Sequence, residues 1–360
     1  MKDHKQAVSA LKTNYYHIKH GADNGLCLVL FSGALLLFSF MTDIIIGGAN
    51  EIGVGETSKA AGFLYGTGNI LMILAICTIA VGIGTSVEKL SFSPALVGGF
   101  LASIGSTLPY PEGTTSSASG IAGGLVAGLT AGYCCKLLRS TLKKKSILKP
   151  YLNILLSTAI TIGVVILLNY LCRLLFTFSS SVLAVLREKN LILTAMLIGC
   201  LMTIDVSGPL YRSAYVFGTA SIVTEDPIVM GIVAGVSIVP PLSIGMSSII
   251  FRKSFTQEEK IVGVSGLFFA LGGITQSALY NYIVRPSLIL PCALGGTVTA
   301  AMISLFMCKS TAPMGGILAI KMIHKPVCFI LSVICGTIVS CLATGIILLI
   351  SEKRNIKRQP

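Results

Sequence analysis

The chain is a series of long apolar runs separated by short polar connections. A run of about 20 mostly apolar residues is long enough to cross a bilayer as a helix. The runs cover residues 26–47, 62–86, 94–109, 118–138, 151–172, 191–206, 227–250, 261–283, 287–308 and 326–350. A soluble protein would have to bury all of them in one core. The pattern therefore predicts an all-α polytopic membrane protein with about ten transmembrane helices.

Three polar stretches that contain glycine or proline interrupt the runs of the second half, at 205–215, 272–286 and 309–316. Irregular backbone at membrane depth survives only where protein or a water-filled cavity surrounds it. Broken segments of this kind form substrate sites in many transporters. We therefore expect two or three broken or re-entrant segments here. The sequence leaves open whether residues 207–223 cross the membrane or turn back.

The basic loop at 136–149 divides the chain into two halves. Residues 1–150 are expected to form an N-terminal membrane half that serves as scaffold and dimerisation surface. Residues 151–350 are expected to form a C-terminal transport half with the broken helices, and 351–360 a cytoplasmic basic tail. Residues 173–190 are less apolar and carry charge at both ends. This pattern favours an interfacial helix that links the halves.

Composition and charge agree with a membrane location. Mean hydropathy is +0.85, and 11% of residues are charged, against about 25% in soluble domains. The net charge of +13 gathers in short clusters, at 2–19, 136–149, 252–260 and 353–358. The positive-inside rule places these clusters and both termini in the cytoplasm. Charges spread over short loops argue against nucleic-acid binding.

The first candidate site is the stretch DVSGPLYRSAYVFG, 205–218. Asp205 is the acidic residue expected nearest to the middle of the membrane, and Gly208-Pro209 would break a helix beside it. One interpretation is that Asp205 caps a helix end or pairs with Arg212, because charges in membranes usually pair. The other is that Asp205 or Arg212 lines a hydrophilic pocket for a sugar or a phosphorylated product. The two interpretations are compatible.

Two further breaks offer polar groups. Thr275 and Gln276 follow a Gly-Gly pair, and the Gln276 amide suits a neutral polyol as well as it suits a hydrogen bond between helices. Residues 313–316, which include Met314 and Gly315, form either a ligand-facing break or a plain turn.

Several function classes lack their motifs. The sequence has no Walker motif, no credible nucleophile with a base, and no zinc spacing among its 11 cysteines and 4 histidines. We therefore expect no metal and no cofactor, and no phosphorylated Cys or His within the chain. Glycine recurs every fourth residue at 120, 124, 128 and 132, which favours a close helix-packing face over a ligand site.

Six segments, in order, resemble the fructose-type membrane component (enzyme IIC) of the bacterial phosphoenolpyruvate-dependent sugar phosphotransferase system. They are SPALVGGFLAS (93–103), SGIAGGLVAGLTAGYCCKLL (119–138), DVSGPLYRSAYVFG (205–218), IVPPLSIGMSSIIFRKSF (238–255), GGITQSALYNYIVRPSLILPCALGG (272–296) and APMGGI (312–317). The resemblance implies a homodimeric sugar permease in the bacterial inner membrane, which works with separate IIA and IIB subunits. The IIB subunit phosphorylates the substrate.

Carried over residue by residue, the resemblance implies a substrate site with nine members. They are Asp205, Gly208, Pro209, Tyr211, Arg212, Thr275, Gln276, Met314 and Gly315. Three positions depart from the family pattern: Gln276 stands for Glu, Met314 for His, and Tyr211-Arg212 for Asn-Lys. Gln276 lacks the ionisable carboxylate of the family, and Met314 lacks its imidazole. These losses predict a different substrate or poor phosphoryl transfer.

Three hypotheses follow. The first is a IIC permease that imports a fructose-like sugar or polyol, coupled to phosphorylation by IIB. The second is a diverged transporter that facilitates diffusion of a small polar solute without phosphorylation, which Gln276 and Met314 favour. The third is a membrane sensor or scaffold subunit that transports nothing.

Overall fold

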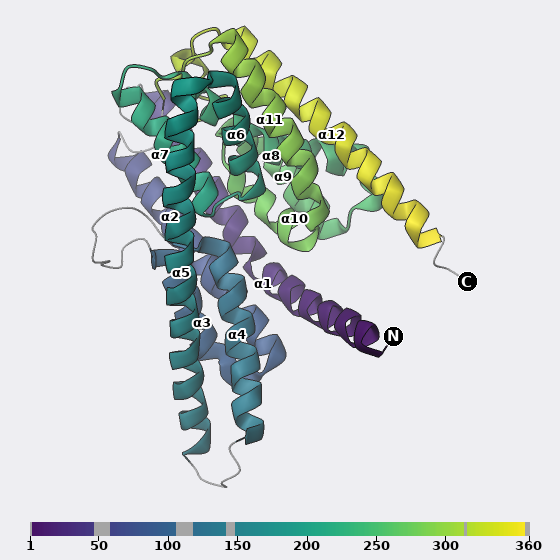
Figure 1. Ribbon diagram of the computed structural model, residues 1–360. Helices are drawn as coiled ribbons and strands as arrows, with labels where there is room; N and C mark the ends of the chain where they lie inside the picture. The colour runs from purple at the N-terminus through teal and green to yellow at the C-terminus, as the bar shows by residue number, and fades with distance from the viewer. Residues whose placement is uncertain (1, 47–57, 106–117, 142–147, 313–314, 357–360) are drawn as a thin grey trace. The chain divides into compact units, whose positions relative to one another are not determined.

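The structure, a computed structural model, describes residues 2–46, 58–105, 118–141, 148–312 and 315–356. Its regular elements in these ranges are all helical. The α-helices are α1 Lys2–Ile46, α2 Lys59–Val87, α3 Phe92–Ile104, α4 Gly120–Thr141, α5 Lys149–Lys189, α6 Leu191–Ile204, α7 Pro209–Val223, α8 Ile228–Ile250, α9 Gln257–Leu271, α10 Leu279–Val284, α11 Ile289–Phe306 and α12 Pro326–Ile356 (Figure 1). Short 3-10 turns are η1 Lys89–Ser91, η3 Arg252–Ser254, η4 Thr275–Ala278, η5 Pro286–Leu288 and η6 Ile320–Met322.

The predicted all-α polytopic membrane class is confirmed. Among the described residues, seven helices are long and apolar enough to cross a membrane. They are α1, α2, α4, α5, α8, α12 and η5 with α11. Helices α3 and α6 are apolar but shorter. The predicted run 261–283 is not one helix, because α9 ends at Leu271 and the chain passes through η4 before α10 begins.

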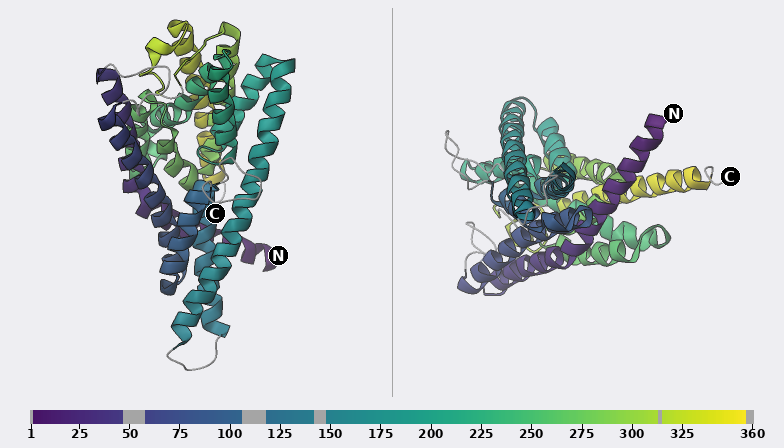
Figure 2. Two further views of the ribbon diagram at one scale, coloured as in Figure 1. Left: turned by 90° about the vertical axis from the view of Figure 1, so that its left-hand side faces the viewer. Right: turned by 90° about the horizontal axis from the view of Figure 1, so that it is seen from below.

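Residues 173–190 do not form the separate interfacial helix that the sequence favoured. They are the second part of α5, which continues without interruption from Lys149 to Lys189 (Figure 2). This stretch contains neither glycine nor proline, and charge alone does not end a helix.

The chain forms two compact units that are bounded differently from the predicted halves. Unit 1 comprises 1–29 and 70–176, and unit 2 comprises 30–69 and 177–360. Helices α1, α2 and α5 therefore contribute residues to both units. The scaffold and transport roles of residues 1–150 and 151–350 stay predictions.

Unit 1 is built on helix packing through glycine. A Cβ atom at Gly124 would lie 2.7 Å from Ile76, one at Gly128 would lie 2.6 Å from the Ala80 carbonyl oxygen, and one at Gly132 would lie 2.8 Å from Val87. The glycines thus let α4 lie directly against the backbone of α2, which confirms the predicted packing face. Helix α3 covers α4 in antiparallel fashion, since Gly98 meets Ala127 and Gly123 meets Ala102.

Unit 2 is centred on α8, nearly all of whose residues are buried. Helices α6, α9, α11 and α12 pack around it, and α11 and α12 run side by side (Figure 1). Gly231 and Gly235 of α8 bring its backbone close to Cys308 and Ile303. The two prolines inside α8, Pro240 and Pro241, remove two backbone donors. Neighbouring helices shield the interrupted ladder, as they do in other membrane helices.

We predict that Gly128→Ala destabilises the protein while Gly163→Ala does not. The new methyl group at 128 would collide with the Ala80 carbonyl, whereas nothing lies within 4 Å of a Cβ at Gly163 of α5. Overpacking of this kind costs about 1–3 kcal/mol, and alanine is otherwise the better helix former. Thermal unfolding of the detergent-solubilised variants measures the difference. Equal melting temperatures for the two variants would contradict the packing role.

Candidate functional site

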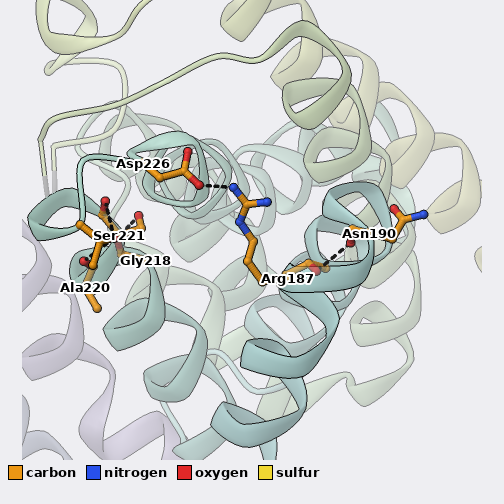
Figure 3. A network of polar contacts seen from close by, with 8 residues as sticks. Arg187, Asn190, Gly218, Ala220, Ser221 and Asp226 are labelled. Atoms are coloured by element: carbon orange, nitrogen blue, oxygen red, sulfur yellow. Dashed lines mark hydrogen bonds and ion pairs between the residues drawn. The ribbon is translucent and has the colours of Figure 1, made fainter.

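Helices α6 and α7 form a hairpin whose ends return to the same place. Arg187, near the end of α5, forms an ion pair with Asp226, just after α7 (Figure 3). The side chain of Asn190 caps α6 by accepting from the backbone N–H groups of Ile192 and Leu193. The start of α6 and the end of α7 therefore lie together, and residues 205–208 form the tip of the hairpin. Helix α7 thus runs back toward the start of α6, and the membrane crossing of residues 207–223 stays a prediction.

Helices α9 and α10 form a second hairpin, closed in the same way. Arg285, which follows α10, binds Glu259 in the first turn of α9, with Nε 2.9 Å from Oε1 and Nη2 3.1 Å from Oε2. Nη2 also donates to the Ser254 carbonyl oxygen at 2.8 Å. Glu259 is 1% exposed and completes a capping box with Thr256. The buried carboxylate is tolerated because the Arg285 guanidinium and the Thr256 backbone N–H both donate to it.

The two hairpins enter unit 2 from opposite ends of α8, and their tips meet beside its middle. Asp226 precedes the start of α8, whereas Ser254 follows its end. At the second tip, Gly273 has φ +67° and lies beside the Ser237 hydroxyl of α8. The Tyr211 side chain, at the first tip, interacts with the Thr275 side chain at the second. The breaks at 205–215 and 272–286 thus form one region.

A third segment joins this region. A Cβ at Gly316 would lie 2.4 Å from the backbone nitrogen of Gly273, so the two chains are in direct contact. The Leu318 N–H donates to the Leu271 carbonyl at 3.0 Å. Both glycines have positive φ, at +67° and +52°, which L-residues with side chains rarely adopt. Glycine at 273 and at 316 is therefore required for this approach.

A small cavity lies where the three segments meet. Its walls are Tyr211, Tyr215, Met230, Val233, Ala234, Ser237, Gly272, Gly273, Gly315 and Gly316. The Tyr211 and Tyr215 rings are parallel, with centroids 6.4 Å apart. The interior has room for about one water molecule. A sugar would have to widen it.

The predicted site residues are placed as follows. Tyr211 and Gly315 line the cavity, and Thr275 lies behind Tyr211. Asp205, Arg212, Thr275 and Gln276, four of the nine residues of the predicted substrate site, are not among its lining residues. Met314 lies outside the described residues.

Asp205 occupies the N-terminus of α7. Its Oδ2 accepts the Leu210 N–H at 2.9 Å, and Gly208 and Pro209 are the N-cap and first residue of that helix. A Cβ at Gly208 would lie 2.1 Å from Asp205 Oδ1, so only glycine leaves room for the carboxylate. Arg212, one turn on, interacts electrostatically with Asp205. The geometry thus supports the capping and pairing interpretation, because a carboxylate at a helix N-terminus also meets the positive end of the helix dipole.

The whole chain is similar to several known proteins. The chain is 28% identical over 342 residues to the PTS system fructose-specific EIIABC component of Bacillus subtilis (strain 168), covering 93% of this chain and 52% of that protein. It is 28% identical over 300 residues to the fructose permease IIC component of Bacillus amyloliquefaciens, covering 81% of the chain and 94% of the relative. It is 22% identical over 353 residues to the fructose-like permease IIC component 2 of Escherichia coli (strain K12), covering 97% and 94%.

The resemblance to the fructose-type IIC family, stated from the motifs, is thereby confirmed. The IIC chain spans about half the length of the first Bacillus relative. No family model matches it.

Sequence reasoning missed the ion pairs that close the hairpins of this IIC chain. A signal was present, because one charged residue precedes each polar break and one of opposite sign lies at or beyond its end. Arg187 precedes and Asp226 follows the first break, and Glu259 precedes the second break, at whose end Arg285 lies. Tyr215 and Ser237 were also missed, since each looks like an ordinary core residue of its helix.

We predict that Asp205→Ala lowers both stability and transport, whereas Asp205→Asn keeps most of the stability. The amide oxygen of Asn can still accept the Leu210 N–H, but alanine leaves that donor unpaired at a cost of about 0.5–2 kcal/mol. Thermal unfolding and substrate uptake of the two variants measure the effect. Stability that is equally low in both would show that the charge facing Arg212, rather than the cap, is what the tip needs.

Proposed function

We propose that this IIC chain is the membrane permease of a phosphotransferase system, which carries a fructose-like sugar or polyol across the cell membrane while a partner IIB subunit phosphorylates it. The supporting observation is the similarity that runs along 93–97% of the chain to proteins named fructose-specific or fructose-like IIC components. The cavity between two opposed hairpins supports the same proposal, because transporters often bind substrates where broken helices meet.

The partners follow from the names of the relatives. The EIIABC component of Bacillus subtilis and the EIIB'BC component of Rhodobacter capsulatus each join a B part to the C part. We infer that separate IIB and IIA subunits serve this chain, with IIB providing the phosphoryl group. A homodimer formed through residues 1–150 completes the proposed assembly.

The proposed substrate site is the cavity together with the residues around its tips. Tyr211 and Tyr215 offer aromatic faces and hydroxyls, and the two Gly-Gly pairs expose backbone to the ligand. Thr275, Gln276, Asp205 and Arg212 surround this core and become ligands when it widens. Gln276, in place of the glutamate of the family, favours a substrate held by neutral hydrogen bonds.

The membrane topology that we propose has two re-entrant hairpins, α6–α7 and α9–α10, which with the crossing helices make about ten segments. Helix α5 crosses once, the first hairpin returns to the side it came from, and α8 crosses back. Helices α3 and α4 run antiparallel, so together they return the chain to the side of the membrane from which α3 starts, and the number of crossings stays even. The basic clusters at 136–149 and 252–260 then share the cytoplasmic side with both termini.

Cysteine labelling checks this topology. In a variant without native cysteines, we expect Lys189→Cys and Thr224→Cys to react with a membrane-impermeant maleimide from outside, and Lys253→Cys from the cytoplasmic side only. Thr224 and Lys253 are exposed, so the reagent reaches both. Opposite sidedness of positions 189 and 224 would mean that α7 crosses the membrane.

Uptake of radiolabelled fructose and related polyols into vesicles tests the proposed function. We expect label to accumulate as a sugar phosphate only when phosphoenolpyruvate and the cognate soluble subunits are present. Tyr211→Phe should lower uptake severalfold through loss of a hydrogen bond of about 1 kcal/mol or more. Tyr151→Phe, on the exposed face of α5, is the matched control. Label that equilibrates unphosphorylated under every condition would favour the facilitative transporter, and no uptake or binding would favour the scaffold.

A further inference from the structure

Two neighbouring grooves lie where α8 ends and α9 begins. The first, of about 570 Å³, is bounded by the end of α8, by η3 and by residues Gly345, Leu348 and Leu349 of α12. The second, of about 540 Å³, runs between the last turn of α8 and the first turns of α9. Arg252 and Lys260 line both of them. We call the two together the paired grooves.

The paired grooves carry net positive charge, because three cations and no carboxylate line them, while one exposed carboxylate, Glu258, lies nearby in the first turn of α9. Arg252, Lys253 and Lys260 line them, and no acidic residue does. Glu259, the adjacent acid, is turned inward, where Arg285 and the Thr256 backbone hold its carboxylate. None of the three cations forms an ion pair with a residue in the part of the chain that the structure describes. An anionic group would therefore be attracted here.

The remaining walls of the paired grooves combine exposed apolar side chains with the polar side chains of Ser248, Ser254, Gln257 and Ser265. Ile250 and Leu349 in the first groove, and Ile249 and Ile261 in the second, are each more than half exposed. They belong to α8, α9 and α12, and α8 and α12 are candidate membrane spans. A soluble phosphate compound would gain nothing from the apolar side chains, whereas an acyl chain would bury apolar surface against them.

We propose that the paired grooves bind an anionic phospholipid. Arg252 and Lys260 hold the phosphate of the headgroup, with Lys253 beside them, and the acyl chains lie along Ile249, Ile250 and Leu349. Arginine suits phosphate because its planar guanidinium donates two parallel hydrogen bonds. Basic sites between membrane helices at the cytoplasmic side are typical places for acidic lipids. The bound lipid would tie the end of α12 to the base of the α9–α10 hairpin.

Native mass spectrometry of the full chain tests this proposal. The protein is released from nanodiscs of equimolar phosphatidylglycerol and phosphatidylcholine, and the retained lipids are counted. We expect wild type to retain phosphatidylglycerol selectively, and Arg252→Gln/Lys260→Gln to retain roughly tenfold less or lower. Arg252→Lys/Lys260→Arg keeps the charge and should keep retention. A melting temperature near that of wild type in phosphatidylcholine confirms that the variants fold.

The matched control removes two exposed cations elsewhere in unit 2, as Lys309→Gln/Lys321→Gln, and should leave retention unchanged. Equal loss in the control would overturn the proposal, because charge in general would then explain binding. Unchanged retention in Arg252→Gln/Lys260→Gln would overturn it as well. If Arg252→Gln/Lys260→Gln kept its phosphatidylglycerol but no longer bound the phosphorylated soluble subunit in pure phosphatidylcholine, the paired grooves would be assigned to a protein partner instead.

Discussion

Close approach of helix backbones at glycine is the interaction on which the rest of this structure depends. Lipid tails are as apolar as leucine, so burial of side chains gives little drive for helices to associate inside a bilayer, and dispersion contacts between closely packed backbones must supply it. In unit 2 a Cβ at Gly199 would lie 2.6 Å from the Gly296 carbonyl oxygen, and one at Gly295 would lie 2.4 Å from that of Gly336. These contacts join α6, α11 and α12 into the frame that holds α8. The frame in turn surrounds the broken segments, which could not persist if lipid reached them.

The two hairpins solve the same physical problem with the same device. A chain that turns back inside a membrane leaves two helix ends unpaired at its tip and brings two helix ends together at its base. Each base is closed by an arginine and a carboxylate, Arg187 with Asp226 and Arg285 with Glu259. The backbone groups at each tip form local hydrogen bonds, with Asp205 in the first hairpin and within the turn at Gly272 and Gly273 in the second. The bases of the hairpins are therefore joined by ion pairs, whereas glycine residues make the close contacts at the tips.

Much of this arrangement could be predicted from the sequence, and the reasons for the rest are physical. The apolar runs gave the helical membrane class, and Gly208-Pro209 and Gly272-Gly273 marked both tips, because these residues end helices by their own backbone properties. The return of α7 could not be predicted, since it depends on the contact of Arg187 with Asp226 across 39 residues. The continuity of α5 was missed because a fall in apolarity was taken as a boundary, although Arg173 is no helix breaker. The sequence left Asp205 with two compatible roles, and the hydrogen bond that it accepts from the Leu210 N–H supports the capping role.

The size of the cavity limits how this chain can handle a sugar. It has room for about one water molecule, so the tips must separate before a hexose enters. The contact that closes it is the approach of Gly316 to Gly273, where no side chain interlocks. The bases, in contrast, are held by charge-assisted hydrogen bonds, which are about twice as strong as neutral ones. Movement is therefore easiest at the tips with the bases fixed. A bulkier residue at either glycine would oppose the closed arrangement, which explains in physical terms why both positions carry glycine.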